Sequence, residues 1–301
     1  MTTYSHVPVM LAEVLEYLNP QGGGRFIDCT LGGAGYTLAL AERVGEKGKI
    51  LGIDLDELAI KNAAAEITRR KIKQIVLVQD NFKNLKDIVN ANFPAETKFD
   101  GIVFDLGLSS AQLDDEARGF SFKGDRPLNM AFGPTEAATV DIVNQYPLLE
   151  LTRIFREYGE ERRAYQIAKA IVAARHRKKI VTTADLVAII EQVVPFRFYS
   201  KIHPATRVFQ ALRMETNEEL AALSAVLPEA VNLLKPTGCL VVVSFHSGED
   251  RIVKRFFKEL ALTDHLRILT KKPLIPTMAE MAANPRARSA KFRAALKTDN
   301  F

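Results

Sequence analysis

The most constraining feature of this chain is a stretch near its start, residues 25–56. An apolar run leads into a glycine-rich turn at 31–37, a helical pattern follows, and a second apolar run ends at Asp54. Glycines let the backbone turn sharply and approach a ligand, because they carry no Cβ. The N–H groups at the start of the next helix face that ligand, and an acid about 20 residues beyond the glycines can bind a ribose. The stretch predicts a βαβ unit that binds an adenosine-containing cofactor, either NAD or S-adenosylmethionine.

The residues around the turn favour one of these two cofactors. The sequence from Gly33 has Leu38 where the NAD fingerprint G-x-G-x-x-G places its third glycine. Asp28 stands just before the turn, where a carboxylate is unfavourable beside a pyrophosphate but favourable beside a sulfonium and an amino group. No Gly-Lys-Ser/Thr follows the glycines, which excludes a P-loop. These features favour S-adenosylmethionine and leave NAD as the alternative.

Further apolar runs predict the rest of a sheet. Runs at 75–78, 101–105 and 239–243 alternate with helical patterns, and 267–269 and 290–296 supply the last strands. Continuous apolar strands separated by helices predict a parallel sheet covered on both faces. Ligands of such sheets bind beyond the carboxyl ends of the strands. We therefore expect a ligand site among the acids that stand at successive strand ends: Asp28, Asp54, Asp80 and Asp105.

The strand–helix alternation stops after residue 105. Residues 109–132 form a long polar stretch with several aromatic residues, which is typical of a functional loop in a compact domain. Residues 139–213 show helical spacing without a strand pattern, and helical patterns up to residue 234 return the chain to the sheet. The predicted organisation is therefore an α/β domain made of residues 1–108 and 214–301, with a helical insertion at 109–213.

The distribution of charge points to a polyanionic partner. The net charge is +5, but residues 1–150 carry 15 Lys and Arg against 21 Asp and Glu. Residues 151–213 carry 13 against 5, and residues 251–301 carry 12 against 4. Two separate basic blocks favour a nucleic acid over a merely solvated helix face.

The remaining composition limits the compartment and excludes two kinds of site. The N-terminus lacks the basic and apolar segments of a signal peptide, and no apolar run approaches the ~18 residues of a membrane helix. We expect a cytoplasmic protein with no membrane contact. Cys29 and Cys239 lie in predicted strands, which indicates buried thiols and neither a disulfide framework nor a metal site.

Specific sequence motifs are spread along nearly the whole chain. They are HVPVML at 6–11, DCTLGGAG at 28–35, DLGLSSAQLD at 105–114, RGFSF at 118–122, YGEER at 158–162, HPATRVFQALR at 203–213, SFHS at 244–247 and NPRARSAK at 284–291. In sequence and in order these motifs resemble those of the RsmH/MraW family of bacterial ribosomal RNA methyltransferases.

The resemblance implies a fold, a reaction and a set of site residues. The fold is α/β, a Rossmann-like class I S-adenosylmethionine-dependent methyltransferase sheet with a helical insertion domain that recognises RNA. The reaction is transfer of a methyl group from S-adenosylmethionine to N4 of a cytidine at the P site of 16S rRNA. The partner is small-subunit ribosomal RNA, within an assembled or nearly assembled subunit. By position, the family's cofactor contacts fall on Ala34, Gly35, Tyr36, Asp54, Phe82, Asp105 and Gln112.

The chemistry requires a group that activates the cytosine amine. The N4 lone pair is delocalised into the ring, and an acceptor that binds the N4 hydrogens can localise and orient it. Asp105 is the best candidate for this catalytic role, followed by Ser109 and His246, although a structural hydrogen bond is an equally good interpretation of His246. A flipped cytidine also needs a stacking partner. Phe120 and Phe122 can supply it, but core packing is the favoured interpretation of both.

Four residues depart from the family pattern. Tyr36 replaces a usual His, Arg126 and Asn129 replace a usual Gly and Asp, and Gly248 replaces a usual Leu. The change at Asn129 keeps a non-catalytic alternative open, in which the protein binds the cofactor and acts as a ribosome-assembly factor. A Rossmann oxidoreductase is the other alternative.

Overall fold

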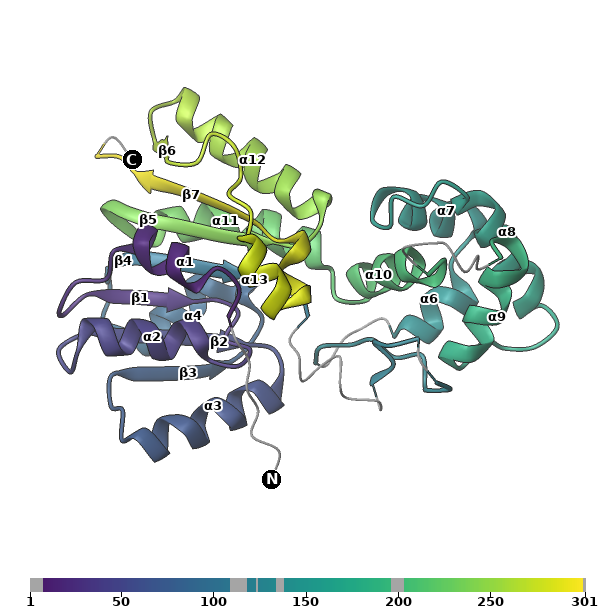
Figure 1. Ribbon diagram of the computed structural model, residues 1–301, viewed down its shortest axis with the longest axis horizontal. Helices are drawn as coiled ribbons and strands as arrows, with labels where there is room; N and C mark the ends of the chain where they lie inside the picture. Colours follow the sequence, from purple (N-terminus) through teal and green to yellow (C-terminus); the bar gives the residue numbers. More distant parts are fainter. Residues whose placement is uncertain (1–7, 109–117, 123, 134–137, 196–202, 300–301) are drawn as a thin grey trace. The chain divides into compact units, whose positions relative to one another are not determined.

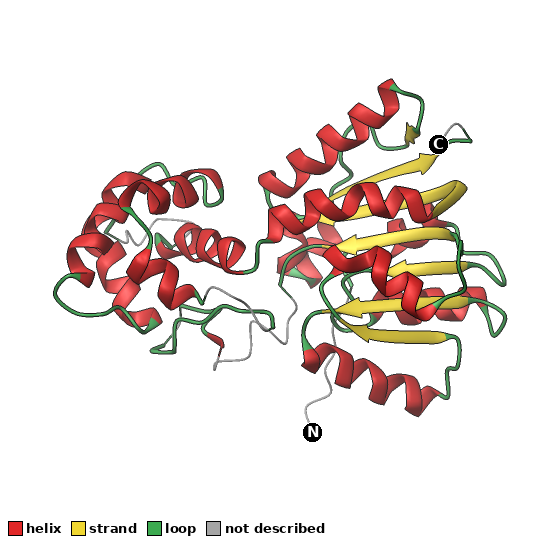
Figure 2. Ribbon diagram, turned by 180° about the vertical axis from the view of Figure 1, so that it is seen from behind, coloured by secondary structure: helices red, strands yellow, loops and turns green. Residues whose placement is uncertain are grey.

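The computed structural model describes residues 8–108, 118–122, 124–133, 138–195 and 203–299. It divides the chain into two compact units (Figures 1 and 2). Unit 1 comprises Met1–Gly107 and Leu220–Phe301, and unit 2 comprises Leu108–Glu219. No helix of the described residues is long and apolar enough to cross a membrane.

Unit 1 is built on a seven-stranded sheet with the order β3-β2-β1-β4-β5-β7-β6. Neighbours among β1 to β5 run parallel, whereas β7 pairs antiparallel with both β5 and β6. The parallel sheet expected for the strands that alternate with helices is confirmed for β1 to β5. The sequence leaves the direction of the last two strands open, because an apolar run indicates a buried strand but not its direction. The strands are β1 (Arg25–Asp28), β2 (Lys49–Asp54), β3 (Ile75–Gln79), β4 (Phe99–Asp105), β5 (Leu234–Ser244), β6 (Leu266–Ile268) and β7 (Lys291–Lys297).

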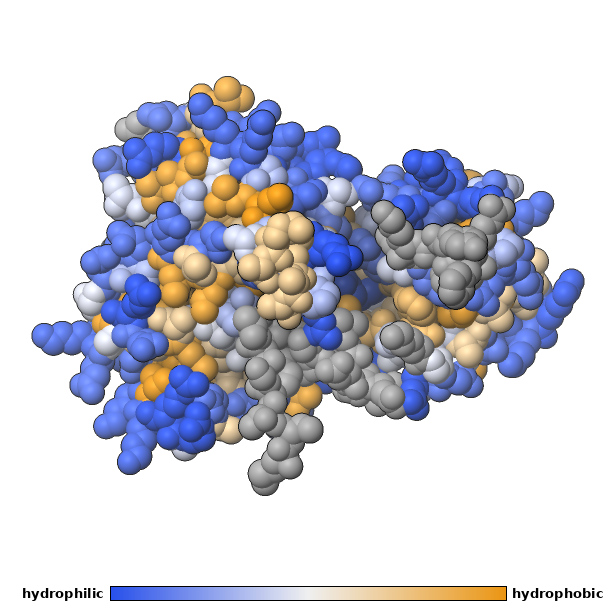
Figure 3. Space-filling view, viewed as in Figure 1, coloured by the Kyte–Doolittle hydropathy of each residue, from blue (hydrophilic) through white to orange (hydrophobic). Residues whose placement is uncertain are grey.

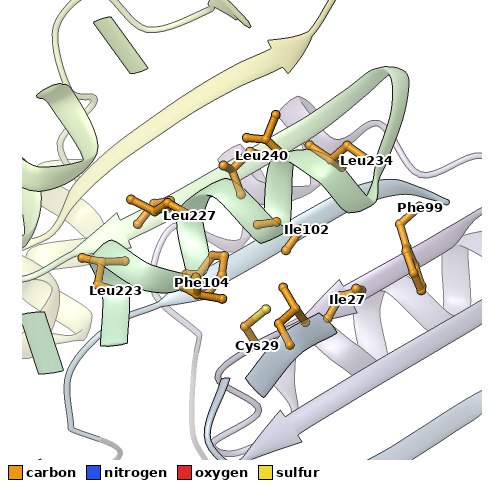
Figure 4. Close-up of a cluster of buried hydrophobic side chains, with 14 of the residues drawn as sticks. Ile27, Cys29, Phe99, Ile102, Phe104, Leu223, Leu227, Leu234 and Leu240 are labelled. Atoms are coloured by element: carbon orange, nitrogen blue, oxygen red, sulfur yellow. The ribbon is translucent and has the colours of Figure 1, made fainter. Parts of the chain in front are cut away.

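Helices cover both faces of this sheet, since successive residues of the inner strands point to opposite sides. On one side α4, α11 and α12 bury residues such as Phe104 and Leu227 (Figure 4). On the other side α1 and α2 pack on residues such as Val103. The helices of this unit are α1 (Leu11–Leu18), α2 (Gly35–Val44), α3 (Glu57–Arg70), α4 (Leu85–Asn92), α11 (Glu219–Leu233), α12 (Ser247–Leu262) and α13 (Met278–Ala283), with 3₁₀ turns η1 (Phe82–Asn84) and η3 (Pro285–Ser289). Cys29 and Cys239 are free and buried within this core, as predicted.

The described part of unit 2 is helical and has its own apolar core, which includes Phe155, Ile171 and Leu212. The Thr182 side chain accepts a hydrogen bond from the N–H of Asp185 and so caps the helix that begins at Thr183. The helices are α6 (Thr139–Gln145), α7 (Leu148–Glu157), α8 (Ala164–Arg175), α9 (Thr183–Val193) and α10 (Ala205–Thr216).

The insertion extends past the boundary expected at residue 213. Helix α10 continues to Thr216, whose hydroxyl lies 2.7 Å from that of Thr139 in α6. The next residue, Asn217, binds the backbone at Met130 and Phe132. These contacts keep the chain within unit 2 up to Glu219. A helical pattern in the sequence shows where a helix runs but not which core it packs against.

Candidate cofactor-binding site

The carboxyl ends of β1, β2 and β4 are adjacent in the sheet, and each carries an aspartate. Asp28, at the end of β1, is fully buried. Its carboxylate accepts hydrogen bonds from the Thr37 hydroxyl at 2.7 Å and the Thr30 N–H at 3.3 Å. Burial raises the pKa of Asp28 to about 6, while the Thr37 hydrogen bond opposes the rise. The first acid of the site is therefore held in place before any ligand binds.

The glycine-rich turn is packed tightly against the N-terminal segment. A Cβ at Gly35 would lie 2.7 Å from Cγ of Pro8, so only glycine fits at the start of α2. Ala34, which precedes it, adopts a left-handed φ of 60°. The side chain of Tyr36 is buried, and its hydroxyl donates a hydrogen bond to the carbonyl of Val9. A ligand close to Ala34 and Gly35 would therefore contact mainly their backbone atoms. The side chain of Tyr36 anchors the turn.

Asp54, at the end of β2, ties the turn to the sheet. One carboxylate oxygen accepts the Gly32 N–H at 2.8 Å and the other accepts the Asp56 N–H at 2.9 Å. Burial raises the pKa of Asp54 to about 6, against the pull of these backbone hydrogen bonds. Each oxygen retains a further lone pair, which suits the hydroxyls of a ribose.

Phe82 follows β3, the strand next to β2. Its ring packs edge-on against Phe104 of β4, with ring centroids 5.7 Å apart. Asp80 stands between β3 and Phe82, where its N–H donates to the carbonyl of Asp54 and its carboxylate accepts from Asn84 at 2.8 Å. The half-buried ring of Phe82 is thus fixed beside the strand that carries Asp54, where a flat purine could pack against it.

Asp105, at the end of β4, differs from the other two acids. Its N–H donates a 2.6 Å hydrogen bond to the Thr30 hydroxyl. Its Oδ1 is shielded from solvent and has no hydrogen-bond partner among the described residues. Burial raises the pKa of Asp105 well above its usual range, the charge of Asp28 adds to the rise, and the Tyr36 hydroxyl opposes it. A buried acceptor without a donor is costly, so this oxygen indicates a place for a hydrogen-bonding or cationic ligand.

The structure gives His246 a capping role. It is the N-cap of α12, and its Nδ1 accepts hydrogen bonds from the N–H groups of Gly248 and Glu249 at 3.1 and 3.3 Å. Glu249 accepts in return from the Phe245 N–H at 2.8 Å, and its other oxygen lies 3.0 Å from Nε2 of His246. Nδ1 therefore serves the capping box, which is the structural alternative considered for His246, whereas the buried Nε2 has no hydrogen-bond partner among the described residues.

The aromatic candidates of the insertion lie in the core of unit 2. Phe120 stacks on Phe132 with centroids 5.6 Å apart, and Phe122 stacks on His203 at 4.7 Å. Nδ1 of His203 also accepts a hydrogen bond from the N–H of Ala205, the first residue of α10, at 3.1 Å. Core packing, the favoured interpretation, therefore describes both phenylalanines. Gln112 and Ser109 lie outside the described residues.

The sequence interpretation missed two residues of the site, Thr30 and Thr37. Their hydroxyls bind Asp105 and Asp28 at 2.6 and 2.7 Å. The available signal was their position on either side of the glycine-rich turn, where a hydroxyl can bind nearby backbone or carboxylate groups. Of the departures from the family pattern, Asn129 is exposed, and a Cβ at Gly248 would lie 3.1 Å from the His246 ring.

The strand order, the antiparallel β7 and the glycine-rich turn beside acidic strand ends define the sheet of a Rossmann-like class I methyltransferase, as predicted. The family model for the MraW methylase family matches residues 3–298, and the chain belongs to this family. The predicted resemblance is thereby confirmed.

Two relatives carry the same description, ribosomal RNA small subunit methyltransferase H. The protein from Thermomicrobium roseum is 45% identical, and the match covers 97% of this chain and 93% of the relative. The protein from Carboxydothermus hydrogenoformans is 43% identical, with 98% of both chains covered. A solved structure of an rRNA methylase from Streptococcus thermophilus covers 98% of this chain and 100% of its own, at 9% identity and a TM-score of 0.47. A similarity this low carries no functional information.

Proposed function

We propose that this protein transfers a methyl group from S-adenosylmethionine to N4 of a cytidine at the P site of small-subunit rRNA. The family and the description of its relatives support an rRNA methyltransferase. The observation that carries the cofactor assignment is the shielded, unpartnered Oδ1 of Asp105 among neighbouring acids. A pyrophosphate would be repelled there, whereas a sulfonium and an ammonium group would be attracted.

The residues at the sheet edge fit the parts of this cofactor. The backbone at Ala34 and Gly35 permits close approach, and Asp54 presents two oxygens to the ribose hydroxyls. Phe82 offers a ring face to adenine, and Gln112 remains a proposed contact. The bound cofactor supplies an electrophilic methyl group on a positively charged sulfur. The Rossmann oxidoreductase alternative is not retained, because the chain belongs to a methylase family.

The proposed catalytic residue is Asp105. A hydrogen bond from the cytosine amine to this carboxylate localises the N4 lone pair and orients it for attack. The Thr30 hydroxyl holds the backbone of Asp105, so the carboxylate is positioned before substrate arrives. The cationic cofactor favours the ionised carboxylate, which is the better acceptor, against the effect of burial.

The test supplies labelled S-adenosylmethionine and small ribosomal subunits that lack the modification, then digests the RNA to nucleosides. N4-methylated cytidine is the expected product. Asp105→Asn should lower the rate of methyl transfer at least about 100-fold, in the range that removal of an acid–base or charge-stabilising group produces. The control is Asp100→Asn, because Asp100 lies at the opposite end of β4 and pairs with Lys235 at 2.6 Å. Cofactor binding by the unmodified protein without any N4-methylated cytidine would contradict the proposal.

A cofactor-binding ribosome-assembly factor without catalysis is the second candidate, because Asn129 replaces the acid usual in the family. The Asn129 side chain is exposed, and its backbone carbonyl accepts a hydrogen bond from the Thr139 hydroxyl. The loop backbone is therefore intact around the substitution. If the unmodified protein is inactive and Asn129→Asp restores methyl transfer, this second candidate is correct.

A further inference from the structure

Helix α12 carries a row of cations on one face. Arg251, Lys254, Arg255 and Lys258 follow the spacing i, i+3, i+4, i+7, which places their side chains along one side of a helix. All four are exposed, and much of the surface around this helix is hydrophilic in the space-filling view (Figure 3). We call these four residues the basic face of α12.

The basic face is not needed to hold the helix in place. The opposite side of α12 buries Val253 and Phe257 against the sheet, with Ile252, Phe256 and Leu260 partly buried beside them. This apolar side supplies the stability of the helix, because burying such side chains removes their apolar surface from water. The cations can therefore be neutralised without unfolding unit 1.

The acids near the start of α12 are committed to other partners. Glu249 caps the helix, and Asp250 binds the guanidinium of Arg293 at 2.6 Å. Within the described part of the chain, no carboxylate forms an ion pair with Lys254, Arg255 or Lys258. Their charge is thus available to an external anion.

Helix α12 begins beside the carboxyl ends of the strands, where the candidate site lies. Its N-cap follows Phe245, whose ring lies 3.4 Å from the position of a Cβ at Gly107. Gly107 comes two positions after Asp105 in the sequence. At 1.5 Å per residue, the basic face starts about 8 Å along the helix axis from the N-cap and ends about 18 Å from it. A nucleic-acid chain with one nucleotide in the candidate site could continue along this face.

We propose that the basic face of α12 binds the phosphate backbone of the RNA next to the nucleotide that is methylated. Unit 1 then contributes its own RNA-binding surface in addition to the helical insertion. This inference rests on the proposed function for its substrate. A row of cations at helical spacing suits repeated phosphates, and phosphate contacts add affinity without sequence preference.

The test compares two triple variants with the same loss of charge. The first is Lys254→Gln, Arg255→Gln, Lys258→Gln. The matched control is Arg43→Gln, Lys47→Gln, Lys49→Gln. These exposed cations lie at the end of α2 and the start of β2, at the amino ends of the strands and away from the candidate site. The measurement is the affinity for small-subunit rRNA at several salt concentrations, together with the affinity for S-adenosylmethionine and the unfolding midpoint.

The α12 variant should lower the slope of log affinity against log salt by about 2, since each lost phosphate contact to a single strand contributes about 0.7. The control variant should keep the parent slope, and both should keep the parent cofactor affinity and unfolding midpoint. Equal slopes for the two variants, or binding of acidic vesicles or acidic proteins in place of RNA, would overturn the inference. If the parent binds RNA through this face but yields no N4-methylated cytidine, the proposed function fails while this inference stands.

Discussion

The N–H of Asp105 donates a 2.6 Å hydrogen bond to the hydroxyl of Thr30, and this contact joins the ends of two neighbouring strands. Thr30 lies just after β1 and before the glycine-rich turn, whereas Asp105 is the last residue of β4. The hydroxyl thus links the glycine-rich turn to the proposed acceptor of the substrate amine. We propose that Thr30 is a positioning residue, because it would act through Asp105.

Replacing Thr30 by Val should therefore lower kcat about tenfold, with a smaller effect on KM for the RNA. The change removes the acceptor of the Asp105 N–H, and small displacements of a reacting group are costly in rate. Steady-state kinetics of methyl transfer measure the effect. Thr30→Ser keeps the hydroxyl and should recover most of the rate. Equal rates for Thr30→Val and the parent would rule out the positioning role.

The glycine-rich turn provides a second prediction. Gly35→Ala places a Cβ 2.7 Å from Pro8, and the resulting shift should weaken binding of S-adenosylmethionine at least about tenfold. Gly22→Ala is the matched control, because nothing lies within 4 Å of a Cβ at that position. Titration calorimetry compares the two variants. Unchanged affinity in Gly35→Ala would show that the cofactor does not depend on this turn.

The buried acid Asp28 should make stability depend on pH. Burial raises its pKa in the folded state from 3.8 to about 6, so the folded protein binds this proton more tightly than the unfolded chain. The free energy of unfolding therefore falls as pH rises from about 4 to about 6, and it stays at the lower value above that range. Asp28→Asn removes the titration, so its free energy of unfolding relative to the parent should rise by about 3 kcal/mol across this window.

Urea unfolding of both proteins between pH 4 and pH 7 checks this prediction. Asp54 is present in both proteins, but its charge adds to the rise in the pKa of Asp28, and the charge of Asp28 raises the pKa of Asp105. The difference between the two proteins therefore reports this coupled cluster of acids. A difference that does not vary with pH would contradict the assignment. The same variant should lose affinity for cationic S-adenosylmethionine more than for the neutral S-adenosylhomocysteine.

In unit 2, Asn217 holds the loop that contains the Asn129 substitution. Its side chain accepts the Phe132 N–H at 2.8 Å and donates to the carbonyls of Met130 and Arg213 at 2.8 and 2.9 Å. Asn217→Ala should destabilise unit 2 by about 2–3 kcal/mol, since each lost hydrogen bond costs about 1 kcal/mol. Hydrogen exchange of the Phe132 amide should speed up accordingly.

Gln145→Ala is the control, because among the described residues that exposed side chain bonds only along its own helix, to Asp141 at 3.0 Å. Equal protection of Phe132 in both variants would show that Asn217 does not hold the loop.

Local sequence signals predicted many of the helices and strands of this protein. The helical pattern expected after the glycine-rich turn is α2, because such a turn and an apolar periodicity act over a few residues. The strand ends that carry Asp28, Asp54 and Asp105 were also predicted, since parallel strands place their carboxyl ends at one edge. The family motifs then pointed to the cofactor and the reaction.

Tertiary structure decided what depends on residues far apart in the chain. The antiparallel insertion of β7 between β5 and β6, the hydrogen bond between Thr30 and Asp105 and the anchoring of Tyr36 by Val9 all join distant segments. Local periodicity carries no information about such contacts, because it records which face of an element is buried but not what it packs against. The sequence by itself thus determined the elements and the acids of the site. The packed fold determined which acid is left with an unpartnered oxygen, because that depends on which donors the other strands bring near it.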